Sequence, residues 1–219
     1  LRVGELQVQD ARLFSDLSLH ARLDRQGLQI DQLSLVRDWL KASAQGLLQL
    51  QGDWPLELQL QAQLPEVQGR EWRLQGRLGG SLQQRLQLQL DSHGYIGVAL
   101  LARLDALGAD LTQLRLQSAD PTQTVALQGR LDWAHALAGT GRLQWQNFPW
   151  QRLWPGVEVP VSLQQLQAEL VYADAAYRAD WQALLNGPAG PFKLSSQTRG
   201  TLQQVQFEQL QLRAGQGRA

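Results

Sequence analysis

Strict alternation of apolar and polar residues is the feature that most limits how this chain can fold. From Leu56 to Leu64 every second residue is apolar, and each residue between is Glu or Gln. A period of two places all the apolar side chains on one face of a β-strand, whereas residues i and i+2 lie on opposite sides of a helix. The other alternating runs are Leu17–Leu23, Trp72–Leu78, Leu86–Leu90, Ile96–Leu104, Val125–Leu131, Tyr177–Ala183, Val205–Phe207 and Leu210–Ala214. The sequence therefore predicts an all-β fold.

Composition alone would favour helices, because roughly one residue in five is Leu and about one in six is Gln. Both residue types prefer helices to strands, by a few tenths of a kcal/mol per residue. Burying three leucines of one short strand is worth more, about 5 kcal/mol at ~1.5–3 kcal/mol each. The pattern is therefore expected to override the propensity.

Turn residues separate the alternating runs at short intervals, which favours consecutive antiparallel strands because parallel strands need long crossovers. The predicted turns are Gly27, Gly52–Pro55, Gly79–Gly80, Ser92–Gly94, Asp120–Pro121, Gly156, Gly187–Pro188 and Gly190–Pro191. Three stretches are ambiguous and could each form a short helix: Asp38–Gln49, Ala99–Leu111 and Asp132–Ala138.

A glycine recurs within the strand pattern, in an element of the form apolar-x-Gly-x-Leu. It is present at Gly76 and Gly129, with related forms at Gly141 and Gly200. Glycine inside a strand marks a bulge or a bend, so a repeated glycine predicts a sheet that curls. No composition boundary divides the chain. We expect residues 1–219 to be one segment of a longer repetitive sheet, with a possible interruption near 146–160.

Charge and cysteine content exclude several classes of protein. Lys and Arg total 20, as do Asp and Glu, and no basic patch of the kind that binds nucleic acid is present. The absence of Cys excludes disulfides, thiolate metal sites and a Cys nucleophile. The chain has no Met and no apolar run long enough for a membrane helix or a signal peptide. We expect it to be an excised piece of a longer protein.

No catalytic motif is present. His20, His93 and His135 are isolated from one another and from carboxylates at metal-ligand spacing. The chain contains no nucleophile elbow, phosphate-binding loop or dinucleotide fingerprint. We expect no enzyme activity, no metal and no cofactor, although a carboxylate pair that meets only in the fold stays open as an alternative.

Tryptophans gather around one connector. Trp145, Trp150 and Trp154 lie close together, with Pro149 before Trp150 and Pro155 after Trp154. They either plug an end of the core or line the wet rim of an apolar groove, where an amphipathic ring is favoured.

An alternating sheet has one apolar face, and something must cover that face. In a sandwich, a second sheet covers this face. In a trough, the sheet folds over, and its apolar walls face each other across a gap. The monotonous Leu/Gln strands favour the trough, because a close-packed core mixes side chains of different sizes.

The sequence resembles the TamB and AsmA-like family. The resemblance is carried by Leu50–Leu58, by Leu74–Leu82 and by Gly141–Trp150, which has the style of a strand followed by a Trp/Pro connector. It covers most of the chain, and it is a style of repeat without a catalytic signature. It implies a U-shaped β-sheet with an apolar interior, in a protein of the Gram-negative periplasm that is anchored in the inner membrane. It also implies contact with the barrel protein TamA through parts of the parent not present here.

These observations predict a groove segment that conducts the acyl chains of phospholipids or supports outer-membrane protein assembly. The alternative is a passive β-scaffold with a closed core and no ligand. The predicted groove-lining residues are Leu56, Leu58, Leu60, Leu74, Leu86, Leu88, Leu90, Val98, Leu100, Leu127, Leu143, Val205, Phe207, Leu210 and Leu212.

Overall fold

The computed structural model describes a chain built from β-strands. The described residues are 2–3, 6–8, 11–14, 16–37, 40–67, 70–94, 96–149, 161–201 and 204–214. Within these ranges there is no helix of the length and apolarity that crossing a membrane requires. The all-β prediction is confirmed.

The chain divides into two compact units, Leu1–Ala106 (unit 1) and Leu107–Ala219 (unit 2). The strands of unit 1 are β1 (Arg2–Val3), β2 (Leu6–Val8), β3 (Ala11–Phe14), β4 (Asp16–Leu23), β5 (Leu28–Arg37), β6 (Leu40–Leu48), β7 (Pro55–Val67), β8 (Arg70–Ser81), β9 (Leu86–His93) and β10 (Gly97–Leu104). The strands of unit 2 are β11 (Gly108–Gln117), β12 (Thr124–Asp132), β13 (Ala138–Gln146), β14 (Ser162–Ala173), β15 (Ala176–Gly187), β16 (Gly190–Thr201) and β17 (Gln204–Ala214).

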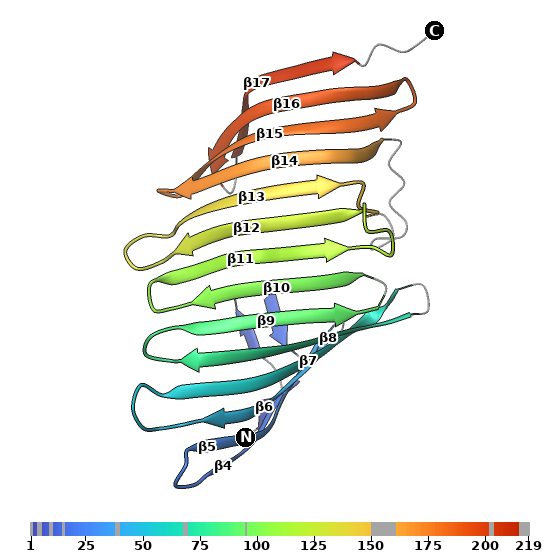
Figure 1. Ribbon diagram of the computed structural model, residues 1–219. Coiled ribbons are helices and arrows are strands. Elements are labelled where there is room, and N and C mark those ends of the chain that lie inside the picture. The colour runs from blue at the N-terminus through green and yellow to red at the C-terminus, as the bar shows by residue number, and fades with distance from the viewer. Residues whose placement is uncertain are drawn as a thin grey trace. The chain divides into compact units, whose positions relative to one another are not determined.

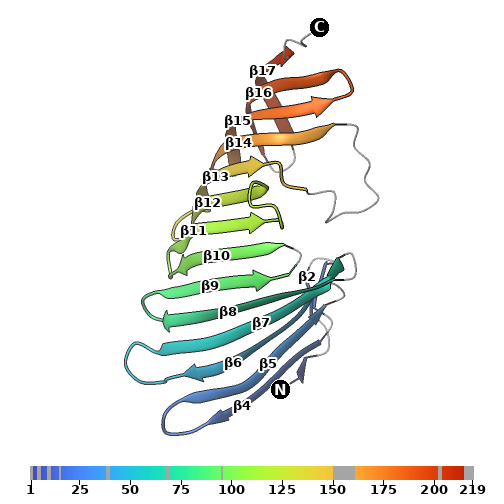
Figure 2. The same cartoon turned by 45° about the vertical axis from the view of Figure 1, so that its right-hand side comes forward.

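Each unit is an open antiparallel sheet (Figure 1). From β4 to β10, and again from β11 to β17, every strand pairs with the next one in the sequence. Strand β1 pairs with β4. The two strands that lie between them in the sequence, β2 and β3, form a separate hairpin. The strands of unit 1 rotate progressively from β10 to β4, which is the normal twist of a sheet (Figure 2). The prediction of a mostly antiparallel, curled sheet is confirmed.

The three ambiguous stretches contain no helix in their described residues. Strand β6 occupies most of the first, and strands β10 and β11 occupy most of the second. The third is the connection between β12 and β13. The alternating pattern therefore overrides the helix preference of Leu here too.

Most predicted turns lie between strands or at a strand end, as Gly190–Pro191 does at the start of β16, but one is wrong. Gly79 and Gly80 lie inside β8, and the reversal follows at residues 82–85, where the Ser81 N–H donates to the Arg85 carbonyl oxygen over 2.9 Å. The predicted turn at Gly156 lies outside the described residues. So does most of the predicted interruption near 146–160, and the single-segment description of 1–219 stays a prediction.

Bulges keep the apolar residues in phase where the alternation breaks. In β17, Phe207 pairs with Thr198 and Gln209 pairs with Gln197, so Glu208 is an extra residue. Phe207 and Leu210 are three positions apart, and the bulge returns both of them to one face. The register of β11 shifts in the same way between Leu111 and Leu114.

One serine organises the end of unit 1. The Ser92 hydroxyl accepts hydrogen bonds from the Val98 N–H (2.7 Å) and from Trp72 Nε1 (3.3 Å), and it donates to the Ile96 carbonyl oxygen (2.8 Å). Ile96 is only 1% exposed. The hydroxyl thus fixes the turn between β9 and β10 against the indole of Trp72.

Replacing Ser92 with Ala is expected to lower the free energy of unfolding by about 2 kcal/mol, because two donors lose their acceptor at once. Chemical denaturation of the variant would measure the loss. Ser43→Ala is the matched control, since Ser43 lies on the polar face of β6 opposite Gln61, and its change is expected to stay within about 0.5 kcal/mol. Equal losses in both variants would contradict this role of Ser92.

Candidate functional site

Register places the apolar residues of unit 1 in rows that run across its strands. In one row, each residue is paired with the next: Leu19, Leu33, Ala44, Leu60, Gly76, Leu90 and Leu100. The neighbouring rows on the same face are Ala21, Ile30, Gly46, Leu58, Leu78, Leu88 and Ala102, and Leu23, Leu28, Leu48, Leu56, Gly80, Leu86 and Leu104. We call this surface the apolar face of unit 1.

The predicted groove residues of unit 1 all lie on this face. Most of them belong to the rows above, and Leu74 pairs with Ala62 in a further row. Val98 lies two positions before Leu100 on β10 and therefore points to the same side. Leu56 is buried, whereas Leu58 and Leu60 are only half-buried. Whether these residues line a lipid groove stays a prediction.

Small residues make a hollow in the apolar face. A groove of about 300 Å³ runs over β5–β9. Its lining combines alanines of β6 and β7 with leucines of β5 and β7–β9; the apolar lining residues are Leu33, Leu35, Ala42, Ala44, Leu60, Ala62, Leu74 and Leu90. Sequence reasoning missed the contributions of β5 and β6. The alternation of Leu40, Ala42, Ala44 and Gly46 was the available signal, but it fell in a stretch that also fitted a short helix.

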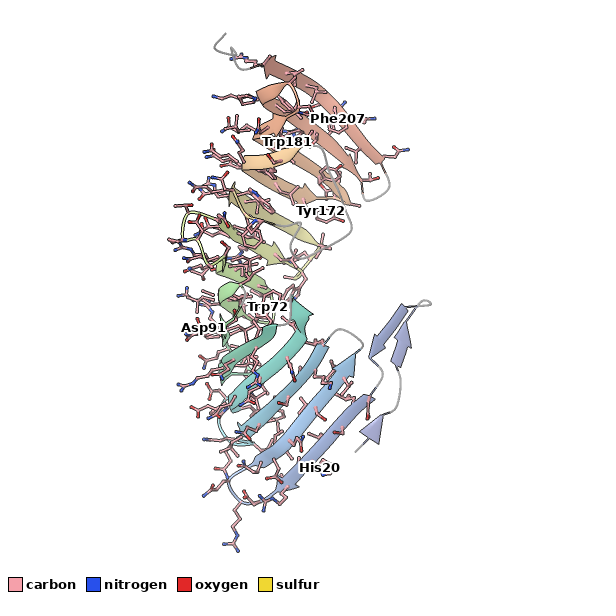
Figure 3. All side chains as sticks on the ribbon, turned by 90° about the vertical axis from the view of Figure 1, so that its right-hand side faces the viewer. His20, Trp72, Asp91, Tyr172, Trp181 and Phe207 are labelled. Carbon is pink, nitrogen blue, oxygen red and sulfur yellow. The ribbon has the colours of Figure 1, made fainter. Side chains whose placement is uncertain are left out.

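Unit 2 repeats the arrangement with its own apolar face. One of its rows is Leu114, Leu127, Leu143, Ala168, Trp181, Ser196 and Leu210. The next is Leu116, Val125, Trp145, Leu166, Ala183, Leu194 and Leu212. Tyr172, Trp181 and Phe207, labelled in Figure 3, belong to this face by register.

The predicted residues of unit 2 also share one face. Leu127 and Leu143 pair with each other at the centre, on β12 and β13. The four predicted residues of β17 are largely exposed, from 58% at Val205 to 66% at Leu212. The apolar face of unit 2 is thus least covered at its last strand.

This second face is not uniformly aliphatic. Ser196 and Thr198 on β16 are each 5% exposed, and the Thr198 hydroxyl donates to the Ala179 carbonyl oxygen over 3.2 Å. Trp145 meets Phe148 edge-on, with ring centroids 5.4 Å apart. The predicted companions Trp150 and Trp154 lie outside the described residues.

The opposite face of each unit is polar. Gln45 pairs with Gln59 and Gln167 with Gln182, and the amides of each pair are hydrogen-bonded at 3.3 and 2.9 Å. A hollow of about 540 Å³ in unit 2 is lined mostly by glutamine, serine and charged side chains of this side. Its polar lining does not suit an acyl chain.

Exposed ion pairs cross the polar faces. Arg142 lies 2.7 Å from Glu169, and Arg22 lies 2.7 Å from Asp31. The hydrogen bond to Asp31 raises the pKa of the Arg22 guanidinium. Such solvated pairs contribute little to stability and bring no charge to the apolar faces.

The histidines do not assemble a site. His20 is exposed on β4, His93 ends β9, and His135 is exposed between β12 and β13. Across the described ranges, no group of three or more His, Cys, Asp or Glu side chains is placed to hold a metal ion. The absence of metal, cofactor and enzyme activity stays a prediction.

A known protein family matches this chain. The family described as TamB, N-terminal domain, matches residues 1–120, which is more than half of the chain. No curated protein and no solved structure matches.

Proposed function

Because the chain belongs to the TamB family, we propose that the apolar faces of its two units bind the acyl chains of phospholipids and let them move along the strands' apolar rows. The headgroup stays in water beyond the face. In this proposal the chain works in the Gram-negative periplasm, as part of a parent protein that is anchored in the inner membrane and serves outer-membrane assembly or lipid transport. Other parts of that parent contact TamA.

The scarcity of buried apolar side chains carries the proposal. In the described part of the chain, only Ala44, Leu56, Ile96, Val125, Phe148 and Ala183 are buried apolar residues. A closed sandwich of this length would bury most of the leucines that alternate along its strands. Instead most of them are half-buried or exposed, as an acyl ligand requires.

The rows also suit movement of a ligand. Each buried CH₂ group contributes about 0.8 kcal/mol, and successive leucines and alanines offer many contacts of similar strength. An acyl chain held by many equivalent contacts has no single preferred position on the face. Neutral glutamines on the other face add no charge that would fix a headgroup.

Lipid capture by the purified chain tests the proposal. We expect phospholipid to copurify with the folded protein and to be detected by mass spectrometry of its extract. A bound hydrophobic dye should be displaced by a single-chain phospholipid and should not be displaced by the free headgroup, glycerophosphocholine. A folded protein that binds neither dye nor lipid would favour the passive scaffold with a closed core.

A further inference from the structure

Alanines interrupt the leucine rows of unit 1 on β6 and β7. Ala42 of β6 pairs with Ala62 of β7, so their methyl groups lie side by side on the apolar face. Leucines continue this row in both directions, with Leu35 on β5 and Leu74 on β8. Because alanine lacks the isobutyl group of leucine, the row is lower over β6 and β7 than over the strands beside them.

The neighbouring row adds a third alanine to the same depression. Ala44 lies two positions after Ala42 on β6 and therefore on the same face. It pairs with Leu33 of β5 and Leu60 of β7. Ala44 is 8% exposed, whereas the other two alanines are half-buried. The three alanines and the leucines around them line the groove of about 300 Å³ described above.

The size of this groove limits what can fill it. Ligand sites usually have volumes of roughly 300–1,000 Å³, so the groove lies at the lower end of that range. Since a cavity of about 150 Å³ holds benzene, a groove of this size takes roughly a dozen carbon atoms. That is most of one acyl chain, and it is less than two chains or a fused ring system.

The lining of the groove suits hydrocarbon alone. The lining side chains that belong to the apolar face are all Leu or Ala. The other two lining residues, Ser43 and Gln61, pair with each other and belong to the polar face of the sheet. No charged residue is among those that line the groove, so the polar end of a ligand must lie beyond it.

We propose that the groove of unit 1 selects unbranched acyl chains, and that Ala42, Ala44 and Ala62 determine this selection. A straight chain lies along the rows and fills the groove, whereas a second branch has to lie outside it, over the leucines. The inference rests on the proposed function and adds a limit on the shape of the ligand. Apolar rows without this depression would bind any hydrocarbon of equal area to the same extent.

Two fatty acids of identical composition test the selection. Hexadecanoic acid is straight, and its isomer 2-hexyldecanoic acid divides the same number of carbons between two arms. We expect the purified protein to bind the straight acid about fivefold more tightly, because only one arm of the branched acid can fill the groove and the other keeps fewer contacts. Titration calorimetry, with both acids below their aggregation limits, measures the two affinities.

Filling the groove should remove the preference. In Ala62→Leu, the added isobutyl group occupies the space of the ligand, so the straight acid should lose its advantage and bind within about twofold of the branched one. Ala102→Leu is the matched control: Ala102 lies on the same apolar face, paired with Leu88, but it does not line the groove. This variant should keep the preference. If the rows bound hydrocarbon by area alone, Ala62→Leu would bind both acids at least as tightly as the wild-type protein.

The outcomes separate this inference from the function on which it rests. Equal binding of both acids by the wild-type protein, or a preference that survives in Ala62→Leu, would overturn the selection by shape but leave acyl binding intact. Binding of neither acid would overturn acyl binding itself. A thermal melt shows whether Ala62→Leu is folded, and Ala42→Leu, at the other alanine of the pair, replaces it if it is not. The comparison of the two acids on the wild-type protein needs no variant.

Discussion

Replacing Gly76 with Ala is expected to destabilise unit 1 by about 3 kcal/mol. Gly76 lies on the apolar face of β8, between Leu60 and Leu90. A Cβ at this position would overlap both the Gln89 carbonyl oxygen and the Leu90 side chain. The carbonyl belongs to the hydrogen-bonded ladder and cannot move without opening the pair of β8 and β9. A loss of this size is a large part of the ~5–15 kcal/mol by which a domain is normally stable.

Gly79→Ala on the same strand is the matched control. A Cβ there would lie 3.7 Å from the Leu56 carbonyl oxygen, which is ordinary contact. We expect this variant to gain roughly 0.5–1 kcal/mol, because alanine has less backbone freedom to lose on folding than glycine. Urea denaturation of both variants would measure the difference. Similar stabilities would show that β8 and β9 do not approach as closely at Gly76 as described.

Replacing Leu88 with Arg is expected to weaken acyl binding in unit 1 strongly while the protein stays folded. Leu88 lies in the middle of the apolar face, half-buried and paired with Leu78 and Ala102. On an open face the Arg stem can cover its neighbours while the guanidinium reaches water. The charge then lies in the path of the hydrocarbon. We expect affinity for an acyl probe to fall at least about tenfold, or ~1.4 kcal/mol, with the free energy of unfolding reduced by about 1 kcal/mol.

Gln89→Arg provides the same charge on the opposite face of β9, where Gln89 pairs with Arg77 and Leu101. Acyl binding should be unchanged in this variant. Titration with a fluorescent fatty acid, beside a thermal melt, separates the two effects. Global unfolding of Leu88→Arg would mean that the face is a closed core, in which an unpaired charge costs several kcal/mol. That result would favour the passive scaffold with a closed core over the acyl-binding groove.

Alternation allowed the fold class and the facing of the strands to be predicted from sequence. From Leu56 to Leu64 every apolar residue is less exposed than its polar neighbours. This pattern is strong because a one-residue slip would turn every leucine of the strand to the polar side.

Bulges could not be predicted, because the sequence records only a break in phase. The runs ending at Phe207 and beginning at Leu210 read as two separate strands, yet one strand with an extra Glu208 joins them. Glycine was misread for a related reason. Gly79 and Gly80 resemble a turn in the sequence, but both belong to β8. The chain reverses only after Ser81, before β9 begins at Leu86.

The face on which the leucines lie was predicted from the sequence, whereas the small residues among them were missed, and the lipid site itself stays a prediction. Ala42 and Ala44 line the groove in unit 1 beside larger leucines of the neighbouring strands, and the local sequence does not show which leucines those will be. The edge-on contact of Trp145 with Phe148 likewise follows from how the chain leaves β13, where Asn147 has a left-handed backbone. Both features arise from packing between strands.

Pairing of each strand with its neighbour in sequence also determines how the chain reaches its folded state. From β11 to β17, no strand must wait for a partner encoded far away. Apart from the connection between β13 and β14, the loops to be closed are short, so their entropy cost is low, and the contact order of each unit is low for an all-β protein. Folding can therefore proceed one hairpin at a time from whichever end is released first, each completed strand serving as the template for the next. A chain built this way can also gain or lose a hairpin during evolution without rearranging the strands already paired.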